Sequence, residues 1–291
     1  MGNIVVMEFR LKWLSLCALL ALLSCQKELH EPEARVEPPV EQKKFIKFST
    51  FSLPDSLIVF QREYGYDGDD KLSSIKTTER FQQPNGTIRT QTGLRRFFRD
   101  NSGRINKIST GPDSSTFIME FGYTGTTSQK PFNAVSYRIR NGITTLLDSV
   151  AISYNANGKV DKTIRFVLLN GGKLDTSSYE TYTYDGTGNL AGKLQYSDSA
   201  GNRRFRVVIG YSWQYDSKNN PLFFDEIPYF FNDGPFAYTA SSNNVVRQIN
   251  NYAFSPSDEL NYFFEYDSEN RLKISRSAGD QKLVTVYYYE Q

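Results

Sequence analysis

The sequence predicts an all-β protein, a long antiparallel meander of repeated β-hairpins that forms a curled, twisted sheet or a partly closed barrel. Three observations predict this class. From Phe45 onward, β-branched and aromatic residues alternate with polar ones. No stretch keeps a helical period of about 3.6 residues beyond two turns. A short motif that ends in turn-forming residues recurs over residues 60–291.

Residues 1–24 have the organisation of a secretory signal. Two basic residues precede an apolar run from Trp13 to Leu23 that contains a single serine. At about 1.5 Å of rise per residue, this run is too short to cross a membrane core of about 30 Å. We therefore expect export rather than a membrane-spanning helix, with translation starting at Met1 or Met7.

The end of this run predicts a lipid anchor. Leu22-Leu23-Ser24-Cys25 resembles a bacterial lipobox, in which a small residue precedes a cysteine that is acylated. The resemblance implies a lipoprotein signal peptide over 1–24 and a mature protein that begins at Cys25. Two or three acyl chains bury enough methylene groups for stable attachment to a membrane. The alternative is an ordinary signal peptide with an incidental cysteine.

Residues 25–44 are predicted to be a tether. The segment after Cys25 holds three prolines and five glutamates, which cannot form a core and favour an extended chain. Gln26-Lys27-Glu28 resembles the lysine-plus-acidic export signal of surface-displayed lipoproteins of Bacteroidota. The expected location is the outer membrane, facing either the cell surface or the periplasm.

Six windows in residues 45–291 share a pattern around one acidic or amide residue, termed here the turn anchor. The residue before the anchor is tyrosine in five windows and Arg99 in the sixth, and an apolar residue stands three positions before it. The anchors are Asp67, Asp100, Asn155, Asp185, Asp216 and Asp267. Their spacings are 33, 55, 30, 31 and 51 residues, so each long gap predicts a degenerate copy, near 121–124 and near 246–249. That makes about eight units.

The third position after the anchor indicates what each unit is. It holds Asp, Gly or Asn, which tolerate a positive φ: Asp70, Gly103, Gly158, Gly188, Asn219 and Asn270. This is typical of a hairpin loop with a type I turn and a bulge. The turn places Tyr184 opposite Leu190 and Asp100 opposite Arg104, and such cross-strand pairs contribute about 0.2–1 kcal/mol each.

Eight hairpins correspond to 14 to 16 strands, whereas open twisted sheets rarely exceed about 10. We therefore expect the sheet to coil on itself, with the apolar rows one and three positions before the anchors facing inward. The last strand, within 282–290, is apolar on both faces, which predicts a covered strand rather than a free edge.

The motif Tyr-x-Tyr-Asp-x-x-Gly-x-Leu at residues 182–190 resembles the YD repeat of Rhs-type proteins. With the lipobox, the chain is similar to YD-repeat-like lipoproteins of Bacteroidota that carry a domain of unknown function. The resemblance covers residues 60–291 and implies a single β domain over 45–291. It does not imply the toxin-enclosing shell of Rhs proteins, because about eight repeats and no cargo domain are present.

Composition excludes several chemistries. The chain has 34 basic and 32 acidic residues, one histidine and two cysteines, and Cys25 and His30 both precede the predicted β domain. That domain therefore has no thiol nucleophile, no Cys/His zinc site and no Ser-His-Asp triad. Near-neutral charge gives no support for a nucleic-acid partner. Asp67, Asp69 and Asp70 lack EF-hand spacing, so we expect no metal and no cofactor.

Two segments are candidate binding sites. An aromatic insertion at 221–236 could, with a nearby tryptophan, bind sugar rings or another apolar ligand; the alternative is a plug over one mouth or edge of the sheet. The candidate residues are Trp213, Phe223, Phe224, Tyr229, Phe230 and Phe231. A basic run from Arg89 to Lys107 could contact anionic polysaccharide or lipid headgroups, or could be a solvated strand face.

These observations predict a non-catalytic, lipid-anchored envelope protein whose β domain binds a ligand or acts as a scaffold. Its expected partners are the membrane, through Cys25, and a glycan or an envelope protein. The alternative is a carbohydrate-active enzyme that uses a carboxylate pair. Glu180, Asp225, Glu226 and Glu265 are available for that role, but no spacing selects a pair.

Overall fold

The computed structural model describes residues 44–52, 57–83, 85–111, 115–169, 172–198, 204–223, 237–278 and 283–290. The chain divides into two compact units, Met1–Lys43 and Lys44–Gln291. The fold below is that of the second unit. The predicted signal peptide, Cys25 and most of the predicted tether lie outside the described residues.

The described part of Lys44–Gln291 forms sixteen antiparallel strands and one short helix. The strands are β1 (Phe45–Ser52), β2 (Leu57–Tyr66), β3 (Leu72–Gln82), β4 (Ile88–Arg99), β5 (Ile105–Thr110), β6 (Ser115–Tyr123), β7 (Pro131–Arg140), β8 (Ile143–Tyr154), β9 (Val160–Leu168), β10 (Leu174–Tyr184), β11 (Leu190–Ser197), β12 (Arg206–Asn219), β13 (Asn243–Tyr252), β14 (Asp258–Tyr266), β15 (Leu272–Ser277) and β16 (Leu283–Tyr289). The helix α2 (Ala237–Ala240) precedes β13. Within the described residues, no helix is long and apolar enough to span a membrane.

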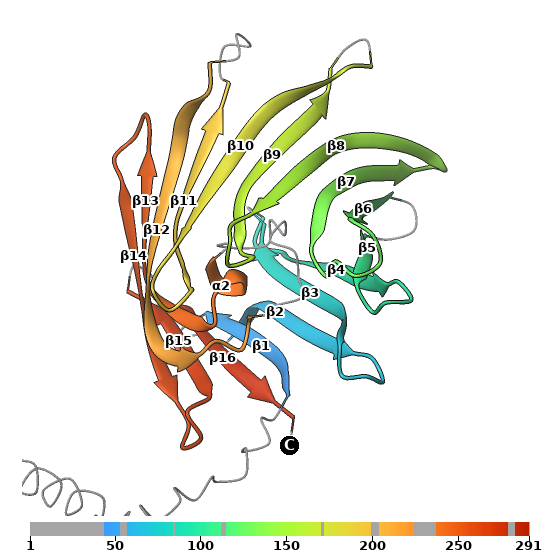
Figure 1. Cartoon of the computed structure of the whole chain (residues 1–291). Coiled ribbons are helices and arrows are strands. Elements are labelled where there is room, and N and C mark those ends of the chain that lie inside the picture. Colours follow the sequence, from blue (N-terminus) through green and yellow to red (C-terminus); the bar gives the residue numbers. More distant parts are fainter. Residues whose placement is uncertain are drawn as a thin grey trace, which may run out of the picture. The chain divides into compact units, whose positions relative to one another are not determined.

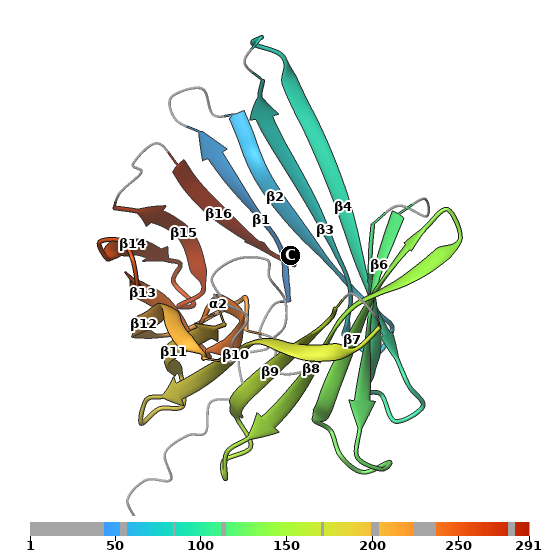
Figure 2. The same cartoon turned by 90° about the horizontal axis from the view of Figure 1, so that it is seen from above.

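Each strand pairs with its neighbours in the chain, and β16 pairs with β1, which closes the sheet into a barrel. The strands follow one another around the barrel in chain order, and β16 lies beside β1 in both views (Figures 1 and 2). The predicted antiparallel meander is confirmed. The prediction that the last strand is covered is also confirmed, because the last strand and β1 form the closing pair.

Successive connections of an antiparallel meander lie at alternate ends of the barrel. The turns that carry the anchors, such as those after β2, β4 and β8, therefore lie at one end, termed here the turn end. The connections after β3, β7 and β9 lie at the other, the loop end. Chain closure also occurs at the turn end, where the Glu290 backbone N–H donates to the Lys44 carbonyl at 2.8 Å.

Five of the predicted turns have the expected bulged geometry. At the first, the Asp70 N–H donates to the Asp67 carbonyl at 3.1 Å, and the Asp67 N–H donates to the Lys71 carbonyl at 2.9 Å. The Asp67 carboxylate also accepts the N–H groups of Asp69 and Lys71. In these five turns, the third residue after the anchor has a positive φ, as predicted: Asp70, Gly103, Gly158, Gly188 and Asn270. The anchor side chain is thus explained by turn chemistry.

The two long gaps between anchors have different causes. The first contains the predicted extra hairpin, since Tyr123 at the end of β6 pairs with Pro131 at the start of β7. The second prediction is wrong, because residues 246–249 lie within β13. The connection between β12 and β13 supplies the extra length, and Asn219 ends β12 instead of forming a bulged turn. Spacing alone does not distinguish an inserted connection from a degenerate hairpin.

Tyrosine hydroxyls link each hairpin to the one before it. The Tyr184 hydroxyl donates to the Val160 carbonyl at 2.9 Å, and the Tyr215 hydroxyl donates to the Leu190 carbonyl at 2.6 Å. Equivalent bonds join Tyr66 to Phe45, Tyr123 to Ile105, Tyr154 to Pro131 and Tyr289 to Leu272. We term this set the tyrosine ring. It explains why the residue before the anchor is tyrosine rather than phenylalanine.

The two departures from the tyrosine ring have chemical explanations. Arg99 replaces tyrosine, and its guanidinium donates to the Leu72 carbonyl at 3.3 Å, which is the equivalent acceptor. The Tyr266 hydroxyl instead contacts the Asp216 carboxylate and accepts from the Asn244 amide at 3.2 Å. Asp216 lies within β12, which continues to Asn219, so no bulged turn follows this anchor.

Most buried apolar side chains lie near the tight turns, in two clusters. The first comprises Phe45, Phe48, Tyr64, Leu72, Phe97, Ile105, Ile108, Phe121 and Ala134. The second comprises Ile152, Val160, Tyr182, Leu190, Trp213, Ala240 and Val245. The residues three before the anchors supply five members, and the tyrosines one before the anchors, such as Tyr66 and Tyr184, pack against the clusters, which confirms the predicted inward rows. The barrel therefore has an apolar core near its turn end.

Replacing Arg99 tests the equivalence of arginine and tyrosine in the ring. Arg99→Met leaves the Leu72 carbonyl without its donor, and we expect the free energy of unfolding to fall by about 1–3 kcal/mol. Arg99→Tyr restores a hydroxyl donor and should retain most of the stability. Urea unfolding of both variants measures the difference, and equal destabilisation would contradict the equivalence.

Alkaline pH should weaken the fold through the buried tyrosines. Burial raises the pKa of Tyr66 and of Tyr287 to about 12 and also raises the pKa of Tyr215. The pKa of tyrosine in an unfolded chain is about 10, so the unfolded chain loses these protons first. Stability should therefore be unaffected below pH ~10 and fall as the pH rises toward ~12. Urea unfolding across this range measures the fall, and Tyr66→Phe should show a shallower one.

Candidate functional site

The inner face of β2–β5 changes character along the strands. Residues opposite one another on paired strands share a face. Arg62 pairs with the core residue Phe48 on one side and with Thr77 on the other, and Thr77 pairs with Gly93. Arg95 pairs with both Ile75 and Thr110. This face is aromatic near the turns and becomes polar farther along the strands.

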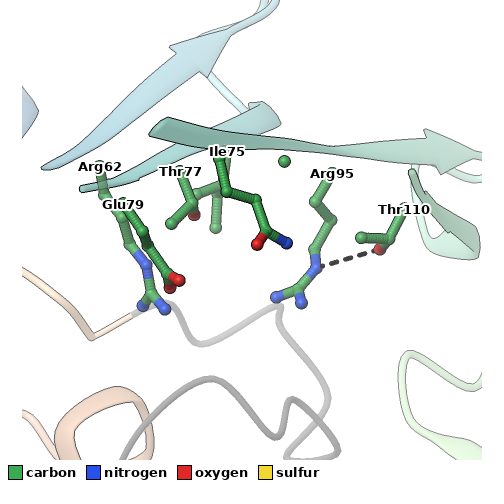
Figure 3. Close-up of a pocket in the computed structure, with 8 residues that line it drawn as sticks. Arg62, Ile75, Thr77, Glu79, Arg95 and Thr110 are labelled. Atoms are coloured by element: carbon green, nitrogen blue, oxygen red, sulfur yellow. Dashed lines mark hydrogen bonds between the residues drawn. The ribbon is translucent and has the colours of Figure 1, made fainter. Parts of the chain in front are cut away.

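A cavity of about 170 Å³ lies on this polar part of the inner face, and we term it the inner-wall pocket. Its lining residues are Arg62, Ile75, Thr77, Glu79, Gln91, Gly93, Arg95 and Thr110. In Figure 3 their side chains project from the same side of the strands. Arg62 and Glu79 lie together at one side of the pocket and Arg95 at the other.

Gly93 provides open space in the pocket. A Cβ atom built on Gly93 would meet no heavy atom within 4 Å, and its backbone does not require a positive φ. Glycine weakens a strand interior, and its presence there often marks a place where a ligand or another chain approaches the backbone closely. Because Gly93 has no side chain, the inner face has open space between Arg62 and Arg95.

The two arginines are held by different contacts. The Arg62 guanidinium lies over the rings of Phe60 and Phe48, 5.2 and 6.0 Å from their centroids. Stacking uses the face of the guanidinium, whereas its N–H donors point along its edge. Arg95 Nε donates to Thr110 Oγ1 at 3.5 Å (Figure 3). Burial raises the pKa of the neighbouring Tyr64 hydroxyl, and the Arg62 charge partly opposes that rise.

A second polar group lies on the inner face of β10 and β11. The Glu180 carboxylate accepts from the Tyr182 hydroxyl at 2.5 Å and from Lys193 Nζ at 3.1 Å. The Lys193 ammonium also lies 4.9 Å from the centre of the Tyr211 ring. Burial, followed by the Glu180 charge, raises the pKa of the Tyr182 hydroxyl. These groups satisfy one another and form part of the structural wall.

The residues predicted to bind a ligand are only partly described. Trp213 is 6 % exposed, and its Nε1 donates to Gln248 Oε1 at 3.0 Å within the barrel. Phe223 is half-buried. Phe224, Tyr229, Phe230 and Phe231 lie outside the described residues. On either side of these residues, Leu222 packs against the first core cluster and Ala240 belongs to the second.

The predicted basic run does not form one surface. By strand pairing, Arg95 faces inward, whereas Arg96 and Lys107 face outward, and the Lys107 ammonium lies 4.6 Å from the Phe98 ring centre. Arg104 pairs with Asp100 at the turn. The run is therefore divided between two faces and a turn.

The sequence did not predict the inner-wall pocket. Its two arginines nevertheless share one position in the repeat, because Arg62 and Arg95 each stand five residues before an anchor.

Among the candidate carboxylates, Glu180 and Glu265 do not form a pair. Glu180 faces inward, whereas Glu265 pairs with Arg276 on the outer face. Asp225 and Glu226 lie outside the described residues. At the acidic turn, the Asp70 carboxylate contacts Lys44. No group of three or more His, Cys, Asp or Glu side chains that could hold a metal occurs among the residues that the structure describes.

The barrel fold is similar to that of a solved porin-like protein. A porin-like protein from Bacteroides uniformis has a TM-score of 0.53 at 13% identity, over 84% of this chain and 98% of that chain. A porin-like protein from Bacteroides vulgatus has a TM-score of 0.39 at 11% identity, covering 85% and 99%. The Photorhabdus luminescens Tc holotoxin pore has a TM-score of 0.29 at 11% identity, covering 76% and 13%. No family model and no curated protein matches the sequence.

The open space at Gly93 can be tested by filling it. Gly93→Val places two methyl groups in the pocket and raises strand propensity, so the free energy of unfolding should stay within about 0.5 kcal/mol of the parent. Gly192→Val is the contrasting variant, because its Cβ would lie 3.3 Å from the Tyr211 carbonyl oxygen and 2.9 Å from Thr183 Oγ1. We expect that crowding to cost about 1–3 kcal/mol in urea unfolding. Equal losses in both variants would contradict an open pocket.

Proposed function

We propose that this chain is a lipid-anchored, non-catalytic protein of the bacterial outer membrane whose barrel stands outside the bilayer and binds a small ligand on its inner wall. The observation that carries the proposal is the reversed polarity of the two faces of the barrel. A transmembrane barrel has an apolar outer band, and a porin also has a polar interior. Here, ion pairs lie on the outer face, and the inner face carries an aromatic core near the turn end with polar groups farther along the strands.

The outer face carries ion pairs between strands. Lys76 pairs with Glu63 across β2 and β3 at 3.3 Å, and Arg247 pairs with Glu259 across β13 and β14 at 2.7 Å. Arg276 pairs with Glu265 across β14 and β15. An Arg or Lys on the lipid face costs about 2–4 kcal/mol at the bilayer midplane. Such pairs favour an outer face in contact with water.

The interior supports the same proposal. The two core clusters occupy the inner face near the turn end, where Tyr64, Tyr182 and Trp213 are each less than 10 % exposed. A conducting pore needs a water-filled interior along its whole length. The apolar core therefore favours a barrel that binds molecules at its inner wall over one that conducts them.

In this proposal, acyl chains on Cys25 attach the protein to the membrane. Cys25 follows the predicted signal peptide and precedes the predicted tether. The tether joins the barrel at Lys44, at the turn end. The name "porin-like" for the Bacteroides uniformis protein is compatible with an envelope location, and the YD-repeat lipoprotein resemblance points the same way. The charged outer face supports an anchored barrel over an inserted one.

Replacing Cys25 separates anchoring from insertion. Cys25→Ser should abolish labelling by radioactive palmitate and move the protein from the membrane fraction to the soluble fraction, because the barrel itself has a charged outer face. Cys17→Ser, in the apolar run, is the matched control and should stay labelled and membrane-bound. Retention of Cys25→Ser in carbonate-washed membranes would overturn the proposal.

A further inference from the structure

We propose that the loop end of the barrel rests on the surface of an anionic bilayer, with apolar side chains of its hairpin tips in the headgroup region. This inference rests on the proposed function, in which acyl chains on Cys25 keep the barrel beside a membrane. It specifies which end of the barrel meets that membrane. Three observations support it: exposed apolar residues at the loop end, basic residues beside them and the length of the predicted tether.

The two ends of the barrel carry different side chains. The bulged turns at the turn end contain no large apolar residue: 67–71, 100–104, 155–159, 185–189 and 267–271. At the loop end, large apolar side chains are exposed at or next to four connections, and we term this set the apolar rim. Its members are Phe81 and Ile88 around the β3–β4 connection, Ile143 after β7, Leu168, Leu169 and Leu174 around the β9–β10 connection, and Tyr252 and Phe254 after β13.

The most exposed members of the apolar rim lie at hairpin tips. Phe254 is 83 % exposed and Ile143 is 68 % exposed. Ile143 pairs with Arg140 across a two-residue turn, in which Asn141 and Gly142 both have a positive φ. The β9–β10 and β13–β14 tips both lie at the upper edge of the barrel in Figure 1. Exposed apolar residues gathered at one end of a molecule are typical of a surface that contacts a membrane or another protein.

The charges beside the apolar rim favour a bilayer. The basic residues are Arg80, Arg89, Arg138, Arg140 and Lys173, and the acidic residues are Glu79, Asp175 and Asp258. The Arg89 guanidinium lies 5.9 Å from the centre of the Phe81 ring, so charge and apolar surface adjoin. Surfaces that bind at a membrane interface combine apolar side chains with lysine and arginine, which attract anionic headgroups.

The predicted tether allows either end of the barrel to meet the bilayer. Extended at ~3.1 Å per residue, residues 25–44 would span up to about 60 Å. A strand such as β10, with 11 residues, is about 36 Å long at ~3.3 Å per residue. The anchor therefore does not force the turn end onto the membrane, although the tether joins the barrel there. Side-chain chemistry selects the end, and the apolar rim favours the loop end.

Tryptophan reporters test this contact in the anchored protein. The purified full-length, acylated protein is placed on vesicles of phosphatidylethanolamine and phosphatidylglycerol whose acyl chains are brominated near the headgroup. The emission of Phe254→Trp, after subtraction of the parent, should be quenched at least ~2-fold more strongly than that of Phe132→Trp, because only the rim enters the interface. Phe132 is the matched control, since it is exposed near the turn end. Equal quenching, or none at residue 254, would overturn the inference.

Removing the apolar rim should weaken vesicle binding by the unacylated barrel. In the Cys25→Ser background, Ile143→Ser combined with Phe254→Ser should bind the same vesicles ~10-fold more weakly in a flotation assay, because two apolar side chains no longer enter the interface. Phe98→Ser combined with Phe132→Ser is the matched control and should bind as Cys25→Ser does. Urea unfolding checks that both double variants are folded. Binding through the rim alone is weak and reversible, so Cys25→Ser still leaves washed membranes.

Three outcomes separate this inference from its alternatives. Equal binding of Cys25→Ser to neutral phosphatidylcholine vesicles would overturn the preference for anionic headgroups. A parent that ignores vesicles but forms a dimer, which the rim variant loses in sedimentation, would make the occupant a second copy and overturn the proposal. If Cys25→Ser releases the protein while Phe254→Trp is not quenched, the rim contact is wrong and the proposed anchoring stands.

Discussion

The hydrogen bond from a tyrosine hydroxyl to the backbone carbonyl of the preceding hairpin is the interaction on which the barrel depends. A bulged turn sets the register within one hairpin, but it does not position that hairpin against the next one. The bond from Tyr184 to Val160, repeated around the turn end, supplies this second constraint. It also satisfies a carbonyl that would otherwise be buried without a partner. Phenylalanine could fill the same space but could not make the bond, whereas Arg99 can.

This arrangement gives the two ends of the barrel different properties. The residues one and three positions before each anchor are mostly aromatic, and they form the core next to the turns. The residue five positions before the anchor faces the same way but lies farther from the turn. There the row includes Arg62, Arg95 and Glu180, which are polar. One repeat thus produces both the closed core and the polar inner wall.

The fold is similar to that of a porin-like protein, and the charge on the outer face supports the proposed position of this barrel outside the bilayer. A barrel fold does not decide whether lipid or water surrounds it; the polarity of its outer face does. Ion pairs such as Arg247–Glu259 place charge on that face, and the Glu259 pKa is lowered to about 2 by its hydrogen bond from Arg247. In the proposed function, attachment to the membrane rests on the predicted lipid at Cys25.

The sequence by itself determined the hairpin unit, its turn chemistry and the inward rows, because turn geometry and two-residue alternation depend only on neighbouring residues. It also predicted 14 to 16 strands, a range that includes the sixteen observed, although the hairpin predicted near 246–249 lies within β13. Only the tertiary structure decided that β1 pairs with β16, since closure depends on the twist and stagger accumulated over all sixteen strands. The same non-local geometry brought Arg62 and Arg95 together from separate hairpins, and it showed the 51-residue gap to be an inserted connection rather than an extra hairpin.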